Sequence, residues 1–88
     1  MTIEELYKSL GYELVLTCGA CPEQYDVLKD SEIVAYLRLR HGRFTVNVPD
    51  VGGKLLYETH PKGDGIFTDD ERYKYLEGAL LHIHNYYY

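Results

Sequence analysis

The residues most able to do chemistry form a run of alternating tyrosine and arginine, Tyr36-x-Arg38-x-Arg40, which Arg43 and Asn47 follow. Alternate residues of a β-strand project from the same side of a sheet, so a hairpin here would gather these side chains on one face. Guanidinium groups beside a tyrosine ring can hold a phosphate, a carboxylate or a stacked base. The pattern therefore predicts a site for an anionic group.

A solvated sheet face is the plainer interpretation of the same residues. The arginines would then pair with nearby acidic residues such as Asp26 and Glu58. The clustering of three arginines and His41 within positions 38–43 favours a site, because like charges on one face repel one another unless a partner neutralises them. The candidate binding residues are Tyr36, Arg38, Arg40, Arg43, Asn47 and, as an aromatic neighbour, Tyr57.

A second candidate is the pair Cys18 and Cys21, whose C-x-x-C spacing suits zinc or thiol redox chemistry. A zinc site needs two more ligands with paired spacing, and His82 and His84 would point to different sides of a helix. A redox pair normally opens a helix, whereas this pair falls in a turn between strands. We expect two buried or half-buried thiols and no metal or other cofactor. A small metal-stabilised domain using Cys18 and Cys21 stays open as an alternative.

Two further segments are chemically biased. The acidic run 64–71 lacks the residue order of a calcium loop, and a capping box of Thr68 and Glu71 at the start of a helix explains its carboxylates. The tyrosines at 86–88 cannot all be buried on one helix face. They predict either a contact with another chain, as in a homo-oligomer, or a frayed terminus.

These residues are positioned by a pattern of strands between two helices. Alternating apolar positions in Ile33–Arg40 and Arg43–Val48, joined by His41-Gly42, predict a hairpin with one buried face. Capping signals and helical spacing predict a helix over 3–10 and another after Thr68, with an apolar stripe of Tyr73, Leu76, Leu80, Ile83 and Tyr87. Further strands are predicted over 12–18, 24–28 and 54–59.

The fold class is therefore α+β. We expect an antiparallel β-meander of four to five strands with an N-terminal and a C-terminal helix packed on one face, in a single domain over residues 1–88.

Composition narrows the function classes. The chain has 88 residues, a net charge of −5 and a sequence pI near 5.2, which argues against direct nucleic-acid binding. No apolar run reaches the length of a membrane span, and the N-terminus is acidic and amphipathic, unlike a secretion signal; both predict a cytoplasmic protein without a membrane partner. No spacing pairs a cysteine with a histidine as nucleophile and base, so we expect a protein that is not an enzyme.

Three segments, Pro22–Val27, Tyr36–Val46 and Pro61–Leu76, resemble those of a group of uncharacterised small proteins from phages and mobile elements of Firmicutes. The resemblance identifies no activity. It implies an accessory protein that acts by binding, and such proteins often counter host defence by occupying a protein target such as a CRISPR nuclease. The expected function is that of an anti-CRISPR-like inhibitor. The alternative is an oligomeric binder that sequesters a nucleotide or another small anionic ligand.

Overall fold

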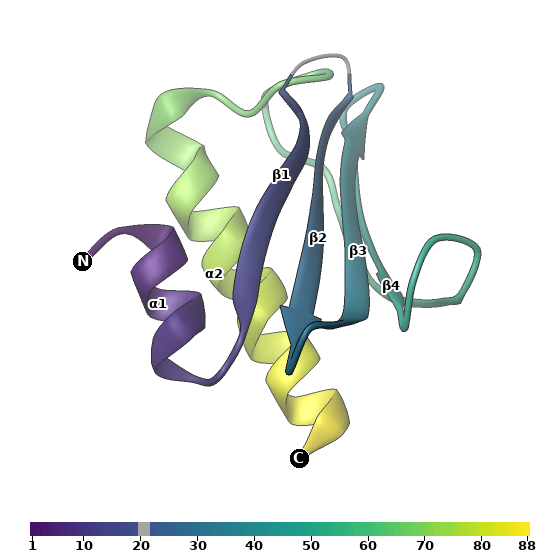
Figure 1. The fold of residues 1–88 in the computed structure, drawn as a ribbon. Coiled ribbons are helices and arrows are strands. Elements are labelled where there is room, and N and C mark those ends of the chain that lie inside the picture. Colours follow the sequence, from purple (N-terminus) through teal and green to yellow (C-terminus); the bar gives the residue numbers. More distant parts are fainter. Residues whose placement is uncertain (20–21) are drawn as a thin grey trace.

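The computed structural model describes residues 1–19 and 22–88 and contains a five-stranded antiparallel sheet with two helices on one of its faces (Figure 1). The strands follow in chain order across the sheet: β1 (Glu13–Gly19), β2 (Glu23–Lys29), β3 (Glu32–Arg40), β4 (Arg43–Val48) and β5 (Lys54–Thr59). The helices are α1 (Ile3–Ser9) and α2 (Asp69–Tyr87). The predicted α+β meander with a helix at each end is confirmed.

Two tight turns set the register of the central strands. Asp30 and Ser31 join β2 to β3 with φ angles of 52° and 67°, and His41 and Gly42 join β3 to β4 with φ angles of 54° and 72°. Paired positive φ angles are typical of two-residue turns whose twist matches that of the strands they connect. In the second hairpin Arg40 therefore lies opposite Arg43, at the tip.

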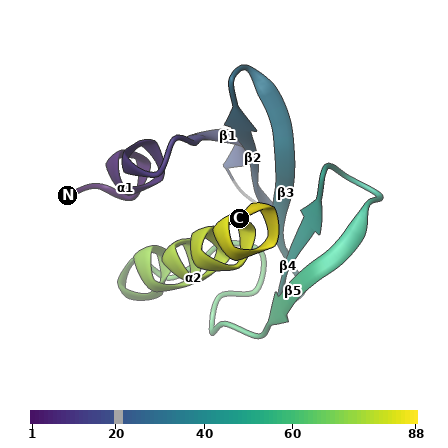
Figure 2. The same cartoon turned by 90° about the horizontal axis from the view of Figure 1, so that it is seen from below.

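The core lies between the sheet and the helices. Seen from below, the sheet curves around α2, and α1 lies at the β1 end (Figure 2). The apolar positions of the central hairpin are fully buried against this layer: Ala35, Leu37, Leu39, Phe44, Val46 and Val48. The Tyr7 hydroxyl of α1 donates a hydrogen bond to the Leu76 carbonyl of α2 at 2.6 Å, which ties the two helices together.

Three predicted core positions are wrong. Ile33 is 39% exposed because a β-bulge in the β2–β3 pairing sets it opposite Leu28, away from the buried face. Tyr73 and Tyr87 are 40% and 38% exposed. The buried apolar residues of α2 are instead Leu76, Ala79, Leu80 and Ile83.

The C-terminal tyrosines pack on their own sheet. The Tyr87 hydroxyl donates to the Val34 carbonyl at 2.6 Å. The Lys54 ammonium lies 5.5 Å from the centre of the Tyr86 ring, and the Lys29 ammonium lies 4.6 Å from that of Tyr88. Each tyrosine thus contacts a different strand, and together these contacts hold the end of α2 against the sheet.

Within the described part of the chain, no helix is both long and apolar enough to cross a membrane.

Candidate functional site

The sheet face opposite the helices carries most of the predicted site. Strand pairing sets two rows of side chains across it: Cys18, Gln24, Arg38, Thr45 and Glu58 in one, and Val15, Asp26, Tyr36, Asn47 and Leu55 in the other. Arg40 and Arg43 extend the first row toward the hairpin tip. The period of two therefore places five of the six candidate binding residues on one face, as the sequence predicts.

The end of this face nearest the tip of the β3–β4 hairpin carries Arg38, Arg40, His41 and Arg43. We call these four residues the arginine face. These residues and Thr45 line a hollow of about 340 Å³. Arg38 is half-buried, whereas Arg40, His41 and Arg43 are exposed. The hollow is therefore open to solvent, with three guanidinium groups along its rim.

The three arginines differ in how they are neutralised. Arg43 forms an ion pair with Glu58, and this hydrogen bond raises the pKa of Arg43 and lowers that of Glu58. Arg38 and Arg40 form no ion pair with any residue of 1–19 or 22–88; Arg40 Nε instead donates to His41 Nε2 at 3.3 Å. The predicted partner Glu58 thus neutralises one arginine and leaves two guanidinium groups available.

Asp26 does not act as the other predicted partner. It lies opposite Tyr36 in the second row, and no ion pair joins it to an arginine among the described residues. Burial raises the pKa of Asp26, and the nearby Asp50 carboxylate adds to the rise. The open face is therefore polarised, with guanidinium groups at the hairpin tip and carboxylates toward the opposite end of the strands.

Tyr36 and Asn47 lie beside the arginines but have their own partners. The Tyr36 hydroxyl donates to Gln24 Oε1 at 2.6 Å, and Asn47 Nδ2 donates to the Gly53 carbonyl at 3.1 Å. The tyrosine is half-buried, so it presents part of its ring to the face. These contacts hold the two side chains in place next to Arg38.

The placement of Tyr57 on this face is wrong. A bulge in the β4–β5 pairing sets Leu55 opposite Asn47 and Tyr57 opposite the buried Val46. The Tyr57 ring therefore points to the helix side, where it stacks on His82 with ring centres 4.1 Å apart. Tyr57 belongs to the packing between β5 and α2 and cannot contribute to the arginine face.

The cysteine pair is described only in part. Cys18 is half-buried on the open face, opposite Gln24, while Cys21 lies outside the described residues. His82 packs against Tyr57, and His84 packs edge-on against Tyr12. In the part of the chain that the structure describes, no group of three or more histidine, cysteine or acidic side chains could hold a metal ion.

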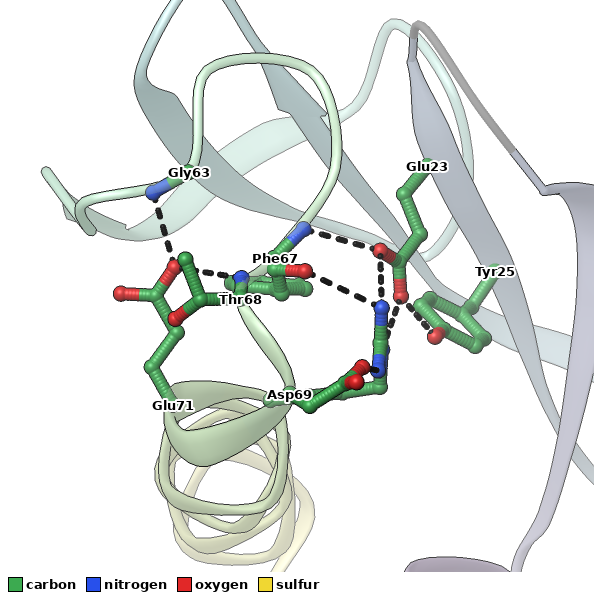
Figure 3. A network of polar contacts seen from close by, with 8 residues as sticks. Glu23, Tyr25, Gly63, Phe67, Thr68, Asp69 and Glu71 are labelled. Carbon is green, nitrogen blue, oxygen red and sulfur yellow. Dashed lines mark hydrogen bonds and ion pairs between the residues drawn. The ribbon is translucent and has the colours of Figure 1, made fainter.

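A buried polar network, absent from the sequence-based prediction, fixes the loop between β5 and α2 (Figure 3). Glu23 on β2 is 2% exposed. Its Oε2 accepts from Arg72 Nε at 2.9 Å and from the Tyr25 hydroxyl, and its Oε1 accepts from the Phe67 N–H at 3.0 Å. Burial alone would raise the pKa of Glu23, but hydrogen bonds from Arg72, Tyr25 and Phe67 outweigh it and lower the pKa.

Glu71 binds the other half of the loop. Its carboxylate accepts the N–H groups of Lys62 and Gly63, both at 2.8 Å, and that of Thr68 at 2.9 Å, which is the bond expected of a capping box. Desolvation would raise its pKa, but these backbone hydrogen bonds lower it below the ordinary value. The two buried carboxylates thus hold the loop between β5 and α2 by its backbone.

Acid should weaken this loop. Because the folded-state pKa values of Glu23 and Glu71 lie below the unfolded value of about 4.3, their stabilisation is complete above that pH and is lost as pH falls through the folded pKa. We expect the free energy of unfolding, measured by urea titration between pH 7 and 3, to fall more steeply below pH ~4.5 in wild type than in Glu71→Gln. Glu4→Gln, at an exposed position of α1, serves as control. Parallel curves for wild type and Glu71→Gln would contradict this assignment.

Comparison with known proteins adds no relative: no family model matches the chain, and neither the curated proteins nor the solved structures give a significant match.

Proposed function

We propose that this protein is a non-enzymatic binding protein that docks an acidic segment of a protein target on the arginine face. The observation that supports the proposal most is that Arg38 and Arg40 share one hollow with Arg43 and have no carboxylate partner among the described residues. Clustered guanidinium groups are favourable when a partner supplies carboxylates, which they bind in a bidentate geometry.

The shape of the hollow favours a protein over a small ligand. Sites for small molecules usually enclose most of the ligand surface. Here the rim of Arg40, His41 and Arg43 is exposed, so a free nucleotide would keep much of its surface in water. An acidic loop of a larger partner fits such a rim, because its contacts extend beyond the hollow.

We also propose a biological setting for this binding. The resemblance to small proteins of phages and mobile elements supports a cytoplasmic protein that counters host defence by occupying a protein target. Because the net charge of the chain is −5, acidic partners are attracted only where basic side chains cluster, which is at the arginine face. Contact with a defence nuclease would then depend on these side chains.

Replacing Arg38 and Arg40 together by alanine tests the proposal. With fluorescently labelled deca-glutamate as the probe, we expect the double variant to bind about 100-fold more weakly than wild type, because two charge-assisted contacts are lost. Lys8→Ala/Lys74→Ala removes the same charge from the helices and should leave affinity within about twofold. Glu58→Gln frees Arg43 from its ion pair and should tighten binding.

Equal binding by the Arg38→Ala/Arg40→Ala protein and wild type would refute the site. Folding should be unaffected, with a change in unfolding free energy within about 0.5 kcal/mol, because neither side chain is ion-paired. Phage plaquing on a host with an active CRISPR nuclease tests the setting: wild type should restore plaques and the double variant should not. A rise in melting temperature with ATP but not with deca-glutamate would instead support the small-ligand alternative.

A further inference from the structure

A second hollow adjoins the arginine face. Its volume is about 360 Å³, and its lining residues are Pro22, Arg40, His41, Asp64 and Gly65. Arg40 and His41 also line the first hollow, so the two form one continuous surface around the hairpin tip. The second hollow differs in charge because it contains the Asp64 carboxylate.

Arg40 and Asp64 line the same hollow without meeting. No ion pair joins them, and Asp64 has no ion pair with any other described residue. Opposite charges that share a hollow attract one another, so each of these side chains can attract a group of opposite charge on a bound segment. The space between them suits a bound segment that offers a carboxylate to Arg40 and a cation to Asp64.

The backbone around Asp64 is fixed from both sides. The Asp64 carbonyl accepts the Gly42 N–H of the hairpin tip at 2.7 Å, and the Gly65 carbonyl accepts the Glu23 N–H at 2.8 Å. A Cβ atom at Gly63 would lie 1.9 Å from the Ile66 carbonyl oxygen, so the preceding turn admits only glycine. The backbone of Asp64 is therefore held in position before any partner arrives, and its exposed side chain projects from a fixed point.

The buried network gives this rigidity its structural basis. Glu71 binds the N–H groups of Lys62 and Gly63, and Glu23 binds that of Phe67, so backbone hydrogen bonds flank Asp64 closely on both sides. Burying two carboxylates is costly unless their hydrogen bonds are complete. Because this loop is already fixed, it loses little conformational entropy on binding. This low entropic cost favours a role in recognition over a role only in joining β5 to α2.

We infer that the Asp64 carboxylate, beside Arg40 and His41, is a subsite for a cationic side chain, so the segment bound on the arginine face carries a lysine close to its acidic residues. This inference rests on the proposed function, because Arg40 must be neutralised by the acidic residues before a second cation can approach Asp64. The arginine face supplies affinity for carboxylates, and Asp64 selects among acidic segments by the cation beside them.

A double-mutant cycle between protein and peptide tests the inference. The probes are alanine-based peptides with three consecutive glutamates, followed by one lysine after zero, one or two alanines. The matched peptides carry norleucine in place of lysine. For at least one spacing, we expect norleucine to weaken binding to wild type about threefold or more. The same replacement should not weaken binding to Asp64→Asn.

The outcomes separate the two proposals. If the glutamate peptides bind through Arg38 and Arg40 but norleucine costs the same affinity in wild type and Asp64→Asn at every spacing, the subsite is refuted and the arginine face stands. If no glutamate peptide binds wild type, the proposed function fails and the subsite fails with it. Asp64→Asn should fold normally, because the Gly42 N–H is bound by the backbone carbonyl of residue 64 and not by its side chain.

Discussion

Replacing Glu71 by alanine is expected to lower the free energy of unfolding by about 2–4 kcal/mol. The side chain accepts three backbone N–H groups, those of Lys62, Gly63 and Thr68, and its removal leaves these donors without their acceptor. The bond to Gly63 is buried and the other two are part-buried, and an unpaired donor costs about 1–3 kcal/mol when it is fully buried and less where water reaches it. A domain of 88 residues has roughly 4–13 kcal/mol of stability in total, so this loss is a large share.

Urea denaturation followed by circular dichroism measures this loss. Glu77→Ala, at an exposed position of the same helix, is the matched control and should change stability by less than about 0.5 kcal/mol. If the alanine variant fails to fold, Glu71→Gln keeps one acceptor oxygen and should show an intermediate loss. Amide hydrogen exchange should then become faster at Lys62 and Gly63. A Glu71→Ala protein as stable as the Glu77→Ala control would show that the loop does not depend on this carboxylate.

The second large effect is expected at Arg72. Replacing it by methionine leaves the Glu23 carboxylate buried without its guanidinium partner, and such broken pairs cost about 3–5 kcal/mol. The loss has a second source, because Arg72 Nη2 also donates to the Phe67 carbonyl at 3.1 Å. Arg72→Met should therefore weaken the attachment of the loop to β2 as well as destabilise the chain, while the hydrogen bonds of Glu23 to Phe67 and Gly65 remain.

A double variant separates charge from packing. In Glu23→Gln/Arg72→Met the neutral amide can still accept the Phe67 N–H but needs no counter-charge. We expect the double variant to be more stable than Arg72→Met alone, by about 1 kcal/mol or more, in the same denaturation assay. Losses that simply add up across the two positions would contradict a coupled pair.

The arginine face could be predicted from the sequence because its determinants are local. A period of two over Ile33–Arg40 and Arg43–Val48 fixes which side chains share a face, and His41-Gly42 fixes the register of the hairpin. The same rule failed at Ile33, and Tyr57 proved not to be a neighbour of the arginines, because in both strands a bulge adds a residue and shifts the side of the sheet on which the side chain lies.

The buried network and the second hollow were beyond sequence analysis because they depend on distant contacts. Glu23 and Arg72 are 49 residues apart, and the approach of Asp64 to the hairpin tip depends on the path of a whole loop. One signal was present: Glu23 alternates with Tyr25 and Val27 on the buried side of β2, and a carboxylate at such a position needs a buried partner. The sequence alone does not identify which cationic side chain is that partner.

Mapping the contact surface by NMR shows whether acidic segments bind the arginine face. A titration of ¹⁵N-labelled protein with deca-glutamate should shift backbone amides of residues 38–45 first and most strongly, and raising the salt concentration to about 0.5 M should reverse the shifts. The amides of α1 and of the exposed side of α2 should stay unchanged. Shifts centred on the helices, or shifts at 38–45 that persist in Arg38→Ala/Arg40→Ala, would contradict a binding site on the arginine face.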